Sequence, residues 1–105
     1  MTILFDQGTP VPLRDALTGH TVATAYERGW STMGNGELLA AAEGASFDVL
    51  ITTDQNLRHQ QQLANRRVAV IVLPTTRWPE IRRHTQEIVA AIAAIQTGGY
   101  HELRW

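Results

Sequence analysis

The feature that most restricts the fold of this chain is the unbroken apolar run VAVIVL at residues 68–73. A strand with one face in water alternates apolar and polar residues, whereas this run has no polar position to offer to solvent. Such runs are typical of strands that are covered on both faces, as in parallel sheets flanked by helices. We therefore expect an α/β fold whose central sheet is mainly parallel.

The rest of the chain alternates short strand-like segments with helical ones. We expect further strands at residues 2–6, 20–25 and 48–53 and an edge strand in the tail at 100–105. We expect helices at about residues 11–18, 35–45, 55–66 and 78–97, several of them bounded by Pro or Gly. This alternation implies right-handed crossovers and helices on both faces of the sheet.

The last expected helix carries one apolar stripe. Ile81, Thr85, Ile88, Ile92 and Ile95 follow one another in steps of four and three residues. That spacing places them on one side of a helix. We expect the stripe to pack in the core, and the alternative is a seam between the subunits of a homodimer.

Composition excludes several classes of function. The length of 105 residues fits one domain, residues 1–105. The net charge of −1 gives no global basic field, and all nine basic residues are Arg. The missing lysine argues against a P-loop, a Schiff base or a phosphoacceptor receiver domain, and the absence of Cys excludes thiol catalysis and Cys-based zinc sites. With no membrane-span or leader-like segment, a cytoplasmic protein is expected.

Two of the expected strands end in a carboxylate, Asp6 and Asp54. Ligands of parallel sheets bind beyond the carboxyl ends of the strands, so both acids can face one crevice. Crowded carboxylates suit Mg²⁺ or Mn²⁺. Glu37 is a third candidate acid, and Asn35 and Asn56 could add neutral oxygens or bind a phosphate. The alternative is structural, because Asp caps turns and helices and an acid such as Glu37 is favoured in a first helical turn.

Two arginines are expected near the same edge of the sheet. Arg58 follows Asp54 by about one helical turn, and Arg77, with Trp78 beside it, follows the strand at 68–73. Phosphate contacts and base stacking would suit these side chains. The alternative is a pair of solvated arginines and a tryptophan in the core.

The order of these landmarks resembles that of the small PIN-like proteins of bacteria and archaea, a DUF5615-type group related to the Mut7-C domain. The resemblance covers about residues 2–75. Its landmarks are Asp6 at a strand end, Gly19-His20 after the first helix, ERGW at 27–30, NGELLAAA at 35–42, and the Thr52, Asp54, Asn56 step after a strand.

The resemblance implies a PIN-like three-layer α/β/α sandwich and a metal-dependent ribonuclease, often the toxin of a toxin–antitoxin pair. Asp6 and Asp54 would hold the ion, and Glu37 would orient or deprotonate the attacking water. RNA and a cognate antitoxin protein would be the partners. Two positions depart from the pattern: Asn35-Gly36 stands where related proteins commonly have Ser-Asp, and Asn56 where they often have Asp.

These departures leave two main hypotheses. The first is an active ribonuclease that uses Asp6, Glu37 and Asp54, with Glu27 as a further candidate acid. The second is a catalytically degenerate PIN-like module that binds or regulates, as the neutral Asn35 and Asn56 suggest.

Overall fold

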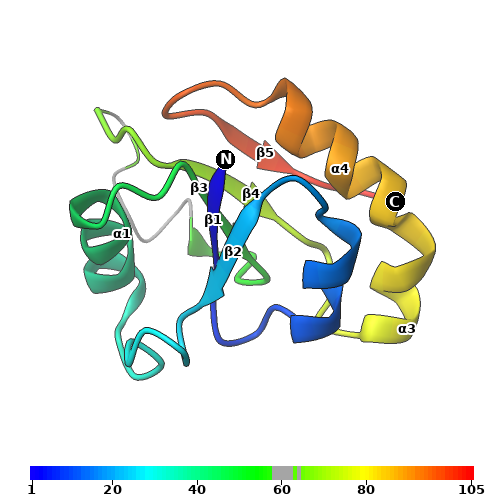
Figure 1. Cartoon of the computed structure of the whole chain (residues 1–105), viewed down its shortest axis with the longest axis horizontal. Helices are drawn as coiled ribbons and strands as arrows, with labels where there is room; N and C mark the ends of the chain where they lie inside the picture. Colours follow the sequence, from blue (N-terminus) through cyan, green and yellow to red (C-terminus); the bar gives the residue numbers. More distant parts are fainter. Residues whose placement is uncertain (58–62, 64) are drawn as a thin grey trace.

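Five short strands form one all-parallel sheet in the order β2-β1-β3-β4-β5 (Figure 1). The computed structural model describes residues 1–57, 63 and 65–105. The expected α/β class and parallel sheet are confirmed, and the tail supplies the edge strand β5. The strands are β1 (Thr2–Phe5), β2 (Thr21–Thr24), β3 (Val49–Thr52), β4 (Ala69–Val72) and β5 (Tyr100–Glu102).

The two faces of the sheet bury different apolar clusters. Alternate residues of a strand point to opposite faces. In the run at 68–73, Ala69, Ile71 and Leu73 join one cluster, and Val68 and Val70 join the other. The expectation of a strand covered on both faces is confirmed.

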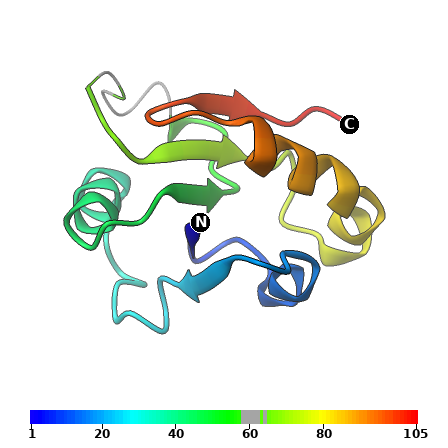
Figure 2. The same cartoon turned by 45° about the horizontal axis from the view of Figure 1, so that its top comes forward.

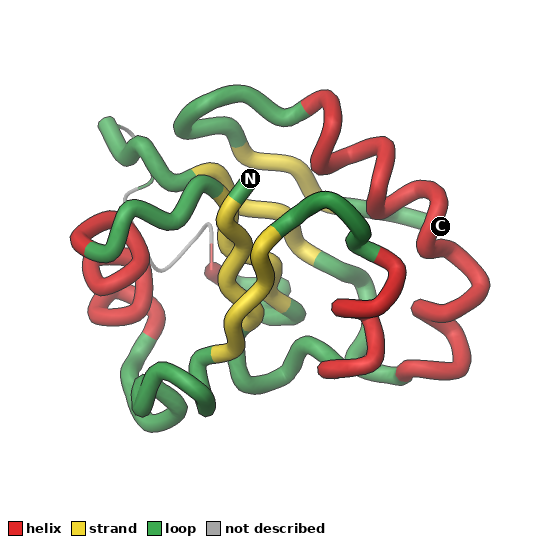
Figure 3. Tube along the Cα trace, in the orientation of Figure 1, coloured by secondary structure: helices red, strands yellow, loops and turns green. Residues whose placement is uncertain are grey.

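Helical segments lie on both sides of the strands (Figure 3). The first cluster also contains Leu13 and Ile88, and the second contains Leu39. These residues come from η1 (Val11–Ala16), α4 (Thr85–Ala94) and α1 (Asn35–Gly44) respectively. The helix expected at 11–18 is thus a short 3₁₀ helix, a form that rarely extends far. Half of the helix expected at 55–66, residues 58–62 and 64, lies outside the described part.

The helix expected at 78–97 is divided into three. It consists of α3 (Trp78–Ile81), the 3₁₀ turn η2 (Arg82–His84) and α4. His84 leaves helical geometry, with φ −125° and ψ 22°. Its ring stacks on Trp105 at a centroid distance of 4.4 Å, and its Nδ1 lies 2.7 Å from Glu87 Oε1. Tertiary contacts at His84 therefore accompany the break in an otherwise continuous pattern.

The apolar stripe of this segment packs in the core. Ile81, Ile88 and Ile92 are completely buried, while Thr85 and Ile95 are half-buried. The core interpretation of the stripe is confirmed. Within the described residues, no helix combines the length and apolarity needed to span a membrane.

The crossovers do not all have the same hand. η1 connects β1 to β2 and α4 lies between β4 and β5, and both pack into the same cluster (Figure 2). The first connection moves toward the β2 edge of the sheet and the second toward the β5 edge. Two connections that cover one face while moving in opposite directions have opposite hands, so the expectation of uniformly right-handed crossovers is wrong. Ile88 and Ile92 are buried in the same cluster as Ile3. Their burial stabilises the path that the chain takes from β4 through α4 to β5.

Adjacent residues of α4 test this packing. Replacing Ile88, which is fully buried, by Ala should lower the free energy of unfolding by about 2–5 kcal/mol, because a cavity remains beside the sheet. Val89 is 40% exposed, and Val89→Ala should cost about 0.5 kcal/mol or less. Urea unfolding of both variants measures the difference. Equal losses would contradict the packing of α4 described here.

Candidate active site at the carboxyl edge of the sheet

The strand order places a ligand-binding position between β1 and β3. From β1 the chain moves to β2 on one side, and then returns past β1 to β3 on the other. In parallel sheets, the crevice beyond the carboxyl ends of the strands at such a reversal is the usual ligand site. Asp6 follows β1 directly and Asp54 lies two residues beyond β3, so both acids flank this position.

A single hydroxyl, that of Thr52, links the two acidic residues. Thr52 is completely buried at the end of β3. Its Oγ1 donates a hydrogen bond to Asp6 Oδ2 and accepts one from the backbone N–H of Asp54 at 3.1 Å. Buried polar groups need partners, so this hydroxyl keeps both of its hydrogen bonds. It therefore fixes the end of β1 relative to the loop that follows β3.

Thr9 holds the other oxygen of Asp6. Its backbone N–H lies 3.0 Å and its Oγ1 2.6 Å from Asp6 Oδ1. The same Oγ1 lies 2.9 Å from the carbonyl oxygen of Ile51, and its one proton can serve only one acceptor at a time. The turn-capping interpretation of Asp6 is therefore part of its role. The carboxylate is oriented from two sides.

Asn35 reaches Asp54 from the start of α1. Its Nδ2 donates to Asp54 Oδ2 at 2.6 Å, while Asp54 Oδ1 accepts the backbone N–H of Asn56 at 2.9 Å. The structure thus brings Asn35 into the site as a donor to the acid. Asn56 contributes through its backbone, and its residue is exposed.

The remaining predicted residues are placed less closely. Glu37 is exposed, and its Oε1 lies 3.4 Å from the backbone N–H of Gly34, which is the capping interaction weighed from the sequence. Arg77 is exposed at the N-cap of α3, near the end of β4. Arg58 lies outside the described residues. In the part of the chain that is described, no three His, Asp or Glu side chains form a group that could hold a metal ion.

Asp6 and Asp54 both keep acceptor capacity that a hard cation would use. Each carboxylate oxygen has two lone pairs, and Asp6 Oδ2 and both oxygens of Asp54 each accept one hydrogen bond from the groups described above. Lone pairs therefore remain on both acids. In proteins, Mg²⁺ usually binds one or two carboxylates and fills its other coordination positions with water.

Sequence reasoning gave Thr9 no role and treated Thr52 only as part of a motif. The signal for Thr52 was a polar side chain that ends a wholly apolar strand, because such a group must find a buried partner. The signal for Thr9 was its position three residues after Asp6, which suits a side-chain-capped turn. Both threonines are positioning residues for Asp6.

A groove of about 370 Å³ adjoins Asp6. Its lining includes Thr9 and Val11 from the first loop and η1, and Tyr26 and Glu27 from the turn after β2. Glu27, the further acid considered from the sequence, forms an ion pair with Arg14 at 2.8 Å. The groove extends the site toward the β2 edge of the sheet.

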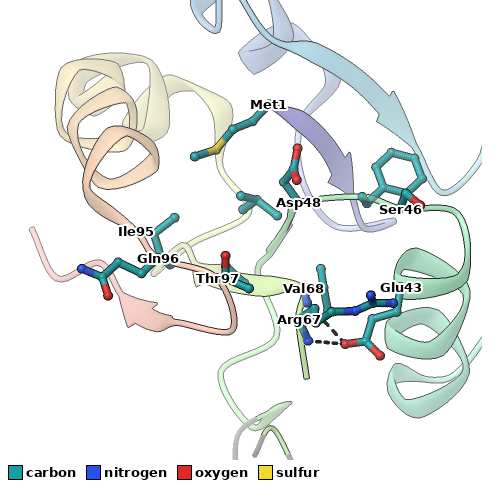
Figure 4. A pocket seen from close by; sticks show the side chains of 12 residues that line it. Met1, Glu43, Ser46, Asp48, Arg67, Val68, Ile95, Gln96 and Thr97 are labelled. Carbon is teal, nitrogen blue, oxygen red and sulfur yellow. Dashed lines mark hydrogen bonds between the residues drawn. The ribbon is translucent and has the colours of Figure 1, made fainter. Parts of the chain in front are cut away.

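A larger hollow of about 570 Å³ lies at the other end of the sheet, where the strands begin (Figure 4). Of its two acids, Glu43 accepts the backbone N–H groups of Arg67 and Val68, and Asp48 accepts that of Thr2. The bond from Arg67 is the main cause that lowers the pKa of Glu43. This carboxylate ties α1 to the start of β4, so its chemistry is structural and the carboxyl edge remains the candidate site.

No family model, curated protein or solved structure matches the chain. A function can therefore be inferred only from the geometry of the carboxyl edge.

Substitution of Thr52 tests the link between the acids. Thr52→Val keeps the shape but leaves Asp6 Oδ2 and the N–H of Asp54 without their shared partner, so the free energy of unfolding should fall by about 1–3 kcal/mol. Thr52→Ser retains the hydroxyl and loses only one methyl group. Its free energy of unfolding should therefore fall less, by about 1 kcal/mol. Chemical denaturation of the two variants measures this. A more stable Val variant would show that the hydroxyl does not bridge the strands.

Proposed function

We propose that this chain is a metal-dependent ribonuclease with a PIN-like α/β/α sandwich, acting as the toxin of a toxin–antitoxin pair. One observation carries the proposal. Two carboxylates lie at the switch point of a parallel sheet, and one buried hydroxyl contacts both residues. The burial of apolar clusters on both faces of the sheet supports the layered architecture.

Asp6 and Asp54 would hold Mg²⁺ or Mn²⁺ at this edge. When bound, such an ion lowers the pKa of water and offsets the charge of a phosphodiester. Thr9 and Thr52 keep the carboxylate of Asp6 in a fixed orientation, and Asn35 does the same for Asp54. Preorganised ligands reduce the reorganisation needed when substrate binds.

The other candidate residues have supporting roles in this proposal. Glu37 stands one half-turn along α1 from Asn35, and its single 3.4 Å contact leaves it able to accept a proton from water. Arg77, at the N-cap of α3, would contact a neighbouring phosphate of the RNA.

Charge-removing substitutions test the nuclease. Asp6→Asn and Asp54→Asn keep side-chain shape but remove one ligand charge each, so RNA cleavage in Mg²⁺ or Mn²⁺ should fall by about 100-fold or more, since even outer-shell changes cost about 10–100-fold. Asp15→Asn, at an exposed position of η1, is the matched control and should cleave normally. Expression of the wild type alone should also slow growth, and both site variants should relieve this. Undiminished cleavage by Asp6→Asn and Asp54→Asn would overturn the mechanism.

A second candidate is a PIN-like module that binds without cutting. The absence of a third acid beside the pair, among the residues that are described, favours it. So do the neutral side chains at positions 35 and 56. In this hypothesis the carboxyl edge would recognise RNA or a regulatory partner, and ion binding would be weak.

Adding a carboxylate at position 35 separates the two candidates. In Asn35→Asp, an acid replaces the amide that now lies 2.6 Å from Asp54, so repulsion should raise the pKa of the pair. Stability without metal should therefore be retained at low pH and lost as pH rises through the titration of the carboxyl groups. Mg²⁺ should restore it, because added ligand charge strengthens binding.

Thermal melting across this pH range, with and without Mg²⁺, measures the effect. Asn56→Asp is the matched comparison, since its exposed side chain should lower metal-free stability much less. If Asn35→Asp melts like the wild type in all conditions, position 35 does not face the site. Tighter ion binding without any RNA cleavage would favour the binding module.

A further inference from the structure

The groove beside Asp6 carries an unusual concentration of exposed apolar surface. Tyr26 is 75% exposed and Val11 is 54% exposed, and both line it. They are two of the four large apolar side chains most exposed in the described part of the chain. Single exposed apolar residues need no explanation, but two that flank one groove next to a candidate site do.

The turn that carries Tyr26 is held by its neighbours. Thr24 and Glu27 bond reciprocally: the N–H of Thr24 donates to Glu27 Oε1 at 2.9 Å, and the N–H of Glu27 donates to Thr24 Oγ1 at 3.0 Å. Arg14 Nη2 adds a bond to the same Glu27 oxygen at 2.8 Å. Tyr26 is therefore carried on a turn whose backbone is fixed, so binding a ligand there needs little ordering of the chain.

The charges of the groove argue against a phosphate inside it. Asp6 and Glu27 are acidic and Arg14 is basic, so the three sum to one negative charge. The hydrogen bond from Arg14, with that from the Thr24 N–H, lowers the pKa of Glu27, which keeps it ionised at neutral pH. A phosphate placed here would meet net repulsion, whereas a neutral ring would not.

The polar groups of the groove suit a ring that both donates and accepts hydrogen bonds. Among the described residues, Arg14 donates one hydrogen bond, from Nη2 to Glu27, and its Nε is buried without a partner, which leaves the other Nη hydrogens as donors for a ligand. Glu27 Oε2 makes no hydrogen bond in the described structure. A volume of about 370 Å³ is within the usual range of small-molecule pockets, about 300–1,000 Å³.

We infer that this groove binds one nucleobase of a single-stranded RNA, stacked on Tyr26, with the sugar–phosphate backbone outside the groove. This inference rests on the proposed nuclease function and deepens it by naming the substrate class. Tyr26 supplies the stacking surface, Val11 the apolar wall, and Glu27 and Arg14 the polar edge. The base, rather than the phosphate, enters the groove because of the charge balance described above.

Binding without metal tests this inference apart from catalysis. A fluorescent single-stranded RNA of mixed sequence, about 6 nucleotides long, is titrated with the protein in EDTA and followed by anisotropy. Tyr26→Ala should weaken binding by about 5- to 150-fold, the usual range for loss of one base stack, and Tyr26→Phe should retain it. Val89→Ala, which trims an exposed apolar side chain of α4, is the control and should bind normally.

An oligomer with the same backbone but no bases shows which part of the RNA is recognised. It should bind weakly, and equally, to the wild type and to Tyr26→Ala. A Tyr26-dependent affinity for this abasic oligomer would overturn the inference, because the groove would then bind the backbone. No detectable metal-free binding of the normal oligomer, or equal binding by wild type and Tyr26→Ala, would overturn it as well.

Cleavage measurements keep this test distinct from that of the nuclease. Tyr26-dependent binding without cleavage in Mg²⁺ or Mn²⁺ would support the base site and refute the nuclease. Asp6-dependent cleavage with an unchanged KM in Tyr26→Ala would support the nuclease and refute the base site. The wild type and Tyr26→Ala should melt at the same temperature, since Tyr26 is mostly exposed.

Discussion

The candidate site depends on one buried hydroxyl group. Thr52 is inaccessible to solvent, and its oxygen lies between the carboxylate of Asp6 and the backbone of Asp54. An apolar residue here would pack as well in the sheet, yet it would leave Asp6 Oδ2 and the N–H of Asp54, both on partly buried residues, without their shared partner. The buried end of β3 therefore anchors two acids that lie in the loops just beyond the strands. A site anchored to such an element holds its geometry well.

Much of the fold follows from simple patterns. The run at 68–73 requires apolar neighbours on both sides, and only a sheet buried on both faces supplies them. The positions of Asp6 and Asp54 at neighbouring strand ends follow from the same argument. Periodicity could not reveal the break at His84, because the ring of Trp105 that stacks on it comes from 21 positions further along the chain.

The site itself was only partly predictable. Adjacency of the acids follows from topology, but the partner of each oxygen depends on side-chain reach. Asn35 was considered as a neutral oxygen ligand or a phosphate contact, and in the structure its Nδ2 donates to Asp54 Oδ2, a contact that the residue pattern does not indicate. The position of Glu37 in the sequence fits either a catalytic acid or a helix-capping residue. Its contact with Gly34 is a capping interaction. A pattern of residue types does not distinguish these roles, since both place an acid in the first helical turn.

The opposite hands of the crossovers bear on how the protein is made. Because α4 packs into the same cluster as Ile3 and Val49, it covers a face of the sheet laid down by the first half of the chain. During synthesis η1 can cover part of that face early, but the part under α4 stays open until residues near Ile92 have left the ribosome. The incomplete chain would present a surface suited to chaperones. Contacts of such long range also slow folding. We therefore expect the protein to become native after its release from the ribosome and not by early collapse of the growing chain.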